Sequence, residues 1–339
     1  MSTTAQDTGT AGTHAPVRDA SAWMAGAMQD PAIWTVRLPQ PVQDELVAEA
    51  GRMDRASLAS IARSEPDAAR LPAAAACLAE IEREVMAGRG FVLIKGLDPA
   101  LDDGTLKACY WTMLKLMGTL VSQNSYGDTL SDVMDTGRRI GEQRVRGYQT
   151  NQDLKFHTDR ACMVTLLCVR QAKAGGKSSI CSATSVYNEL LAHRPDVLKI
   201  LFNGLNFMSI EEGGAITVTR IPIFHIADGV VSVRYSCNSM TSAIMNGVPY
   251  TDAEKEALEV VDRIAADPCF RLDMNFECGD IQAINNFTTL HARTEFEDYP
   301  EAHLKRRLMR GWVATHIRRP LGAHYHDYFG IPVTLERAA

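Results

Sequence analysis

The chain has 339 residues, of which 46% are hydrophobic and 22% are charged, and its formal net charge is −6. Because 35 basic side chains stand against 41 acidic ones, the chain lacks the positive charge that neutralises a phosphate backbone, and we expect no nucleic-acid partner. No stretch approaches the roughly 18 consecutive apolar residues of a membrane-spanning helix, so we expect no membrane association.

The start of the chain and the cysteines favour a reducing compartment. Residues 1–20 are small and polar without the apolar region of a signal peptide, and we interpret them as a disordered tail. The 8 cysteines are scattered and form no CxxC pair, which is typical of reduced thiols. The expected localisation is therefore cytoplasmic, and a homo-oligomer is compatible with these patterns.

Helices are predicted in the first third of the chain. Apolar residues recur at helical spacing over 41–62, and a second helix is predicted over 71–86, before Gly88. The apolar run 91–97, bounded by glycines, is typical of a buried strand, and another helix is predicted over 106–117.

The rest of the chain is mostly β in character. Loops with short strands are expected over 118–150, which is rich in Gly, Ser, Asn and Asp. The later predictions, in chain order, are strands at 162–169 and 178–183, helices at 185–193 and 195–202, short β segments over 204–250, and strands within 270–297 and 303–317. Thr251 and Glu254 form a capping-box pattern that begins a helix reaching Ala266. Because strands and helices do not alternate regularly, we predict an α+β fold, a β-rich barrel or sandwich flanked by helices.

His157 and Asp159 form a His-x-Asp pair that could hold a metal ion. On a strand, the two-residue period of side chains would place both on one face. A hydrogen-bonded surface pair would give the same pattern, so the pair needs a third ligand to be informative. His291 follows an apolar strand, and two histidines with one carboxylate are the facial triad of non-haem Fe(II) oxygenases. The other histidines considered fit this role less well: His14, His193, His324 and His326.

The segment RRLMR places Arg306, Leu308 and Arg310 on one strand face. A guanidinium that points into a barrel is costly unless it meets a carboxylate, which a diacid co-substrate would supply. A solvated basic edge is the alternative, and we expect it for Lys305 and Arg307.

Four segments, in this order, resemble the TauD/TfdA-type family of Fe(II)/2-oxoglutarate-dependent dioxygenases, in its clavaminate synthase-like form. They are FHTD at 156–159, AGGKSSI at 174–180, GDIQAINNFTTLHART at 279–294 and RRLMRGW at 306–312. The resemblance runs from about residue 88 to about residue 318, and four ordered motifs are more specific than any one of them.

This resemblance implies a double-stranded β-helix (jelly-roll) core in a single domain over 21–339. It implies Fe(II) held by His157, Asp159 and His291, and Arg310 paired with the far carboxylate of 2-oxoglutarate. Ser178 stands where the family often has a threonine that assists this contact, and Arg306 would brace the site. It also implies O2 as a co-substrate, ascorbate as a reductant, and release of succinate and CO2. The carboxylate of Asp159 favours hydroxylation, desaturation or related C–H oxidation over halogenation.

The primary substrate, a small-molecule metabolite, is not specified by these motifs. Loops over about 118–150 and 204–245 are expected to cover the site, since ligand contacts concentrate on such loops. For each polar candidate a structural hydrogen bond is the alternative to a substrate contact; the candidates are Gln123, Asn124, Tyr148, Arg160, Arg234 and Asn286.

Two other function classes use the same residues. A zinc hydrolase or lyase could employ the three ligands, but zinc has no need of a clamp for a diacid, so Arg310 counts against it. A non-catalytic ligand-binding barrel would have to keep buried ligands without a metal, which is costly.

Overall fold

The computed structural model describes residues 14–139, 145–210, 216–322, 325 and 329–335. Most of the predicted tail, residues 1–13, lies outside this part of the chain, as do His324 and His326. No helix in the described part is long and apolar enough to cross a membrane.

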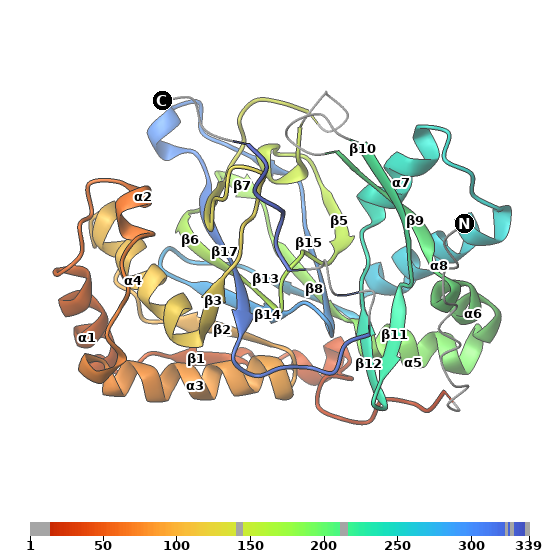
Figure 1. Cartoon of the computed structure of the whole chain (residues 1–339), viewed down its shortest axis with the longest axis horizontal. Coiled ribbons are helices and arrows are strands. Elements are labelled where there is room, and N and C mark those ends of the chain that lie inside the picture. Colours follow the sequence, from red (N-terminus) through yellow and green to blue (C-terminus); the bar gives the residue numbers. More distant parts are fainter. Residues whose placement is uncertain (1–13, 140–144, 211–215, 323–324, 326–328, 336–339) are drawn as a thin grey trace, which may run out of the picture.

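The predicted N-terminal helices gather at one end of the molecule (Figure 1). They are α1 (Gln40–Ala50), α2 (Leu58–Ile61), α3 (Pro72–Ala87) and α4 (Asp103–Met117), with 3-10 turns at Ala25–Met28, Pro31–Ile33 and Ala68–Arg70. The single helix predicted over 41–62 is wrong, because the chain leaves α1 at Gly51 and starts α2 with a new cap, the side chain of Ser57 accepting from the backbone of Ser60.

Two main sheets make up the centre of the fold. The larger has the order β1-β2-β14-β6-β17-β3, and β4 also pairs with β17. Its strands are β1 (Thr35–Arg37), β2 (Phe91–Lys95), β3 (Gly118–Leu120), β4 (Leu130–Val133), β6 (Met163–Arg170), β14 (Ile281–Asn285) and β17 (Arg307–Thr315). The smaller has the order β13-β8-β15-β5, with β5 (Leu154–His157), β8 (Ser178–Ser182), β13 (Arg271–Met274) and β15 (Thr289–Arg293). Except for the parallel pair β1–β2, the pairings in both sheets are antiparallel.

The two main sheets face each other and share one apolar interior. Ile180 and Leu272 of the smaller sheet lie in the same buried cluster as Ile284 and Trp312 of the larger sheet. The Ser178 hydroxyl donates to Gln282 Oε1 across this interior at 3.1 Å. The prediction of a β-rich core flanked by helices is therefore confirmed at the level of a mixed structure of helices and antiparallel sheets.

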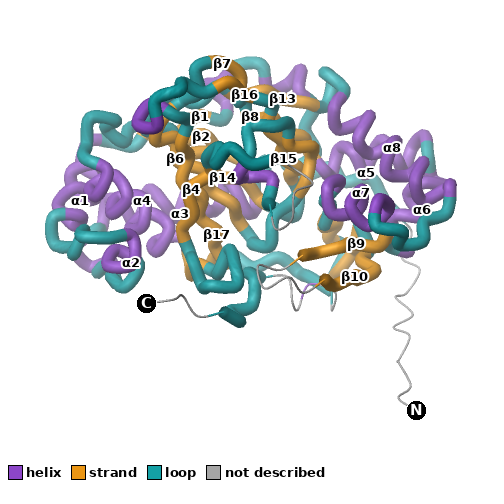
Figure 2. The backbone as a smooth tube through the Cα atoms, turned by 90° about the horizontal axis from the view of Figure 1, so that it is seen from above, coloured by secondary structure: helices purple, strands orange, loops and turns teal. Residues whose placement is uncertain are grey.

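A second group of helices and hairpins covers the other end (Figure 2). Its members are α5 (Ala183–His193), α6 (Pro195–Asn203), α7 (Cys237–Met245), α8 (Asp252–Ala266), the hairpin β9 (Leu205–Ile210) with β10 (Ile216–Ile221), and the hairpin β11 (Phe224–Ala227) with β12 (Val230–Val233). The smaller elements elsewhere are β7 (Ala174–Gly175), β16 (Phe296–Glu297) and 3-10 turns at Gly147–Gln149 and Ala302–Leu304. The capping box of Thr251 and Glu254 is confirmed.

The two segments expected to cover the site are more structured than loops. Residues 204–245 form two hairpins and α7, so the all-β texture predicted there missed a helix that the side chain of Ser236 caps. Residues 118–150 contain β3, β4 and the turn at Gly147–Gln149. Residues 140–144 and 211–215 of these segments lie outside the described residues.

Residues 329–335, which follow β17 in the chain, lie against the segments that carry Ser122 and Arg160. The Gly330 N–H donates to the carbonyl of Arg160 at 2.7 Å, and the Ile331 N–H donates to the carbonyl of Ser122 at 2.9 Å. The Ile331 side chain is buried in the cluster that contains Trp312. The C-terminal segment therefore closes one side of the interior.

β17 packs closely on α4 at Gly311. A Cβ at this position would collide with Leu114 and would lie 2.9 Å from Thr165 Oγ1, with no flexible solvent-facing neighbour to give way. We expect Gly311→Ala to lower the free energy of unfolding by about 1–3 kcal/mol, as overpacking does in tight cores. Denaturant unfolding measures this, with Gly26→Ala as control because a Cβ there has nothing within 4 Å. Equal stability of the two variants would contradict the packing described.

Candidate active site

The three predicted ligands converge at one end of the space between the sheets. Strand pairing sets His291 of β15 directly opposite His157 of β5, and their ring centroids are 4.1 Å apart. Asp159 Oδ1 lies 4.0 Å from His157 Nε2, and Asp159 Oδ2 lies 3.9 Å from His291 Nε2. One ligand atom from each residue falls within 4.8 Å of the other two. Two imidazoles and one carboxylate in this arrangement fit a facial triad.

His157 is oriented, and His291 is kept neutral, in ways that suit metal binding. His157 Nδ1 lies 2.8 Å from the carbonyl of Lys155, which leaves Nε2 facing Asp159. His291 is buried, and burial followed by the nearby His157 lowers its pKa to about 3. The His291 imidazole is therefore neutral at ordinary pH, and the neutral form is the one that coordinates metals.

Asp159 is placed by a loop and not by a strand, so the prediction that the His-x-Asp pair shares a strand is wrong. β5 ends at His157. The Asp159 N–H donates to Asn286 Oδ1 at 3.1 Å, and Asn286 Nδ2 donates to the carbonyls of Asp159 (2.7 Å) and Ala161 (3.1 Å). Asn286, which follows β14, therefore makes the structural hydrogen bonds that were the alternative to a substrate contact.

Two side chains of β17 stabilise the negative charge of Asp159. Arg310 Nη1 and Trp312 Nε1 donate to Asp159 Oδ2 at 3.1 and 2.8 Å. Burial alone would raise the pKa of Asp159, but the charge of Arg310, the neighbouring imidazoles and the Trp312 hydrogen bond outweigh burial and lower that pKa to about 2. The carboxylate is thus ionised over the whole working range of pH. Trp312 had no predicted role, although its place two residues after Arg310 puts it on the same inward face.

Arg310 is enclosed by two predicted residues, Gln123 and Tyr148, and by Trp312. Its guanidinium carbon lies 4.9 Å from the centre of the Tyr148 ring and 4.7 Å from that of Trp312. Its Nε donates to Gln123 Oε1 at 2.8 Å, and Gln123 Nε2 donates back to the carbonyl of Arg310 at 2.8 Å. Gln123 and Tyr148 therefore lie beside the triad.

The other substrate candidates are not all gathered there. Asn124 donates to Asp128 at 2.7 Å within its own turn. The guanidinium of Arg234 lies 6.0 Å from the ring of Phe207 on β9. Arg160 follows Asp159, and its carbonyl accepts the hydrogen bond from the C-terminal segment.

Arg306 is the second inward arginine, and it differs from Arg310 in that its guanidinium forms no ion pair with a described residue, although its backbone N–H donates to Asp298 Oδ1 at 2.7 Å. Only 4% of its surface is exposed, and its Nη1 is buried without a hydrogen-bond partner. Burial lowers its pKa to about 10, so the guanidinium still carries its charge at neutral pH. Its guanidinium carbon lies 4.9 Å from the centre of the Phe296 ring.

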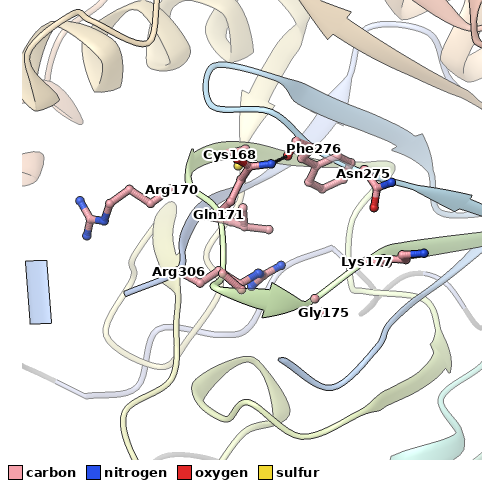
Figure 3. A pocket seen from close by; sticks show the side chains of 11 residues that line it. Cys168, Arg170, Gln171, Gly175, Lys177, Asn275, Phe276 and Arg306 are labelled. Carbon is pink, nitrogen blue, oxygen red and sulfur yellow. Dashed lines mark hydrogen bonds between the residues drawn. The ribbon is translucent and has the colours of Figure 1, made fainter. Parts of the chain in front are cut away.

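A cavity of about 130 Å³ adjoins Arg306 (Figure 3). The picture shows Arg306 extending toward Gly175, whereas Arg170 and Lys177 point away from it. A Cβ on Gly176 would lie 3.1 Å from Arg306 Nε, and the φ of Gly176 is +69°. The paired glycines therefore allow the turn before β8 to approach this side chain closely, two residues from Ser178.

Comparison with known proteins places this site in context. Residues 63–312 match the family described as "Taurine catabolism dioxygenase TauD, TfdA family". The chain is 28% identical over 306 residues to the FR-33289 synthase of Streptomyces rubellomurinus, covering 88% of this chain and 90% of that protein. It is 28% identical over 242 residues to a uridine-5'-phosphate dioxygenase of an Amycolatopsis species, covering 66% of this chain and 85% of that protein.

Solved structures share the fold. An asparagine oxygenase in complex with Fe(II), 3-hydroxyasparagine and succinate has a TM-score of 0.60 at 18% identity, covering 83% of this chain and 94% of that one. The non-haem iron oxygenase OrfP in complex with Fe and α-ketoglutaric acid has a TM-score of 0.60 at 14% identity, covering 83% and 93%.

The hydrogen bonds of Asn286 predict a measurable effect on metal binding. Asn286→Ala should weaken binding of a divalent metal by about 10–100-fold, because the loop that carries Asp159 loses its anchor. Titration with Fe(II) without oxygen, or with Co(II), measures the affinity. Asn124→Ala is the matched control, since that amide bonds only within its own turn. Unchanged metal affinity in Asn286→Ala would show that the loop holds Asp159 without this side chain.

Proposed function

Because the chain belongs to the taurine catabolism dioxygenase TauD, TfdA family, we propose that it is an Fe(II)- and 2-oxoglutarate-dependent oxygenase that oxidises a C–H bond of a small molecule. The observation that carries this proposal is the convergence of His157, Asp159 and His291 with the carboxylate ionised. When bound, the metal and 2-oxoglutarate supply the activation of O2, with release of succinate and CO2. The protein supplies the ligands, the orientation and a water-poor interior.

The two facing antiparallel sheets support the finer description of the core as a double-stranded β-helix. Ligands separated by more than 130 positions meet between these sheets, which favours a single catalytic unit over residues 21–339. The retained carboxylate at position 159 supports hydroxylation or a related oxidation.

We infer that the far carboxylate of 2-oxoglutarate meets Arg306 and Ser178. Arg310 already has a carboxylate partner in Asp159, whereas Arg306 is buried with an unpaired Nη1. A buried charge without a counter-ion is costly, and an anionic ligand would remove that cost. Arg306 precedes Arg310 by four residues, about 13 Å of extended chain, so its guanidinium can receive the end of a molecule whose other end is at the triad.

Arg310 then acts mainly on the metal ligand, keeping Asp159 ionised and oriented. The resemblance that assigned the far carboxylate to Arg310 stays a competing prediction, which the variants below decide. Ascorbate would serve only as a reductant that keeps the iron ferrous.

The primary substrate is proposed to be a small polar metabolite. Similar proteins support this proposal, since one is a uridine-5'-phosphate dioxygenase and another an asparagine oxygenase. Gln123 and Tyr148 are the favoured candidates for substrate contact, because both lie beside Arg310, whereas Asn286 is occupied by the loop of Asp159. Ile331 and Trp312 would limit the access of water on the apolar side.

The activity is tested by succinate release. Purified protein with Fe(II), ascorbate, O2 and 2-oxoglutarate should release succinate slowly alone and faster with a matching substrate. His157→Ala should reduce the background rate to that of buffer with iron, because one of the three ligands is gone. His193→Ala, on the exposed end of α5, should retain the rate. A background rate in His157→Ala equal to that of the wild type would contradict the proposal.

The two inward arginines are separated by their response to 2-oxoglutarate. Arg306→Gln should raise the concentration for half-maximal succinate release about tenfold or more, the loss expected for a charge-assisted hydrogen bond. Metal content should be unchanged. Arg310→Gln should weaken metal binding and leave that concentration near the wild-type value. Arg307→Gln, whose guanidinium pairs outside with Asp103 and Asp132, is the control. The opposite result for Arg306 and Arg310 would assign the far carboxylate to Arg310.

A further inference from the structure

A third buried arginine, Arg293, has no role in the site described so far. It ends β15 two residues after His291, so both side chains lie on the same face of the smaller sheet. Strand pairing sets Arg293 directly opposite Ser178 of β8. Side chains of directly opposite residues are close enough to interact. Only 6% of the surface of Arg293 is exposed.

The side-chain hydrogen bonds of Arg293 use one of its three guanidinium nitrogens. Nη2 donates to the carbonyls of Thr150, at 2.9 Å, and Gln152, which belong to the loop leading into β5 and His157. Nε and Nη1 are buried and have no hydrogen-bond partner. The arrangement therefore leaves two donors available between the sheets.

Arg293 and Arg306 are two buried arginines that contact the same aromatic ring, and the charge of Arg306 acts on Arg293. Their guanidinium carbons lie 4.8 and 4.9 Å from the centre of the same ring, that of Phe296. No described carboxylate is within ion-pair distance of either guanidinium. The charges of Asp153 and Asp135 act on Arg293 without an ion pair, and that of Asp298 acts on Arg306, whose backbone N–H donates to Asp298 Oδ1 at 2.7 Å. Three donor nitrogens of this pair are unsatisfied, which is the pattern expected where an anion is to bind.

We propose that Arg293 is a positioning residue of the co-substrate site. Arg293 adds a second positive charge at the end of the site that receives the far carboxylate, and it connects that end to the loop before His157. The proposal rests on the proposed function, because it takes the anion to be 2-oxoglutarate. Its consequence is selectivity: the pair of charges favours a 2-oxo acid with a second carboxylate over one that ends in a methyl group.

The test compares two acids of equal chain length. Fe(II)-loaded protein without oxygen is titrated in a calorimeter with 2-oxoglutarate and with 2-oxopentanoate, which lacks the far carboxylate. Arg293→Gln keeps an amide donor for the loop carbonyls and removes the charge. It should weaken 2-oxoglutarate binding about tenfold while changing 2-oxopentanoate binding less than about twofold. Arg293→Lys keeps the charge and should retain most of the preference.

A control variant and three further outcomes complete the test of Arg293. Arg319→Gln is the control, since Arg319 also donates to a backbone carbonyl, that of Val231, but none of its hydrogen bonds reaches the site. An equal loss of affinity for both acids in Arg293→Gln, or no loss for either, would overturn the proposal and leave a structural arginine. If Arg293→Gln does not fold, loss of the preference in a folded Arg293→Lys would overturn it. A wild-type protein that does not distinguish the two acids would instead refute the co-substrate assignment itself, whatever Arg293 does.

Discussion

The negative charge of Asp159 is the feature on which the rest of the site depends. Its carboxylate lies between His157 and His291 and accepts hydrogen bonds from Arg310 and Trp312. These contacts join the smaller sheet, the loop after β5 and the central strand β17. Removing that charge would leave Arg310 buried without a negatively charged partner, so the ligand set and the packing of the sheets support each other.

The two ends of the space between the sheets differ in how their buried arginines are neutralised. At the triad end a guanidinium is paired with a carboxylate of the protein, whereas at the other end Arg306 and Arg293 have none. A dicarboxylic 2-oxo acid fits this pattern, because one of its carboxylates can accompany the metal and the other can neutralise the unpaired end. Ser178 and the close turn at Gly175–Gly176 border the same end.

Local patterns were sufficient to predict much of this from sequence. The capping box before α8 depends on residues three positions apart, and the burial of Arg306, just before β17, and of Arg310 within it follows from a two-residue period. The roles of Asn286, Trp312 and Arg293 depend on which strands become neighbours and in which register, and a single sequence does not display that. Asp159 shows the limit clearly: the spacing predicted a metal ligand beside His157, but a hydrogen bond from a residue 127 positions away places it.

The central claim is that one site holds a metal at the triad and the far carboxylate of 2-oxoglutarate at the unpaired arginine. A crystal structure of the protein with Fe(II) and 2-oxoglutarate, grown without oxygen, tests it most directly. We predict iron bound to His157, Asp159 and His291, and a carboxylate within hydrogen-bond distance of Arg306 Nη1 and Ser178 Oγ. A far carboxylate bound to Arg310 with Arg306 still unpaired, or iron bound elsewhere, would contradict the account.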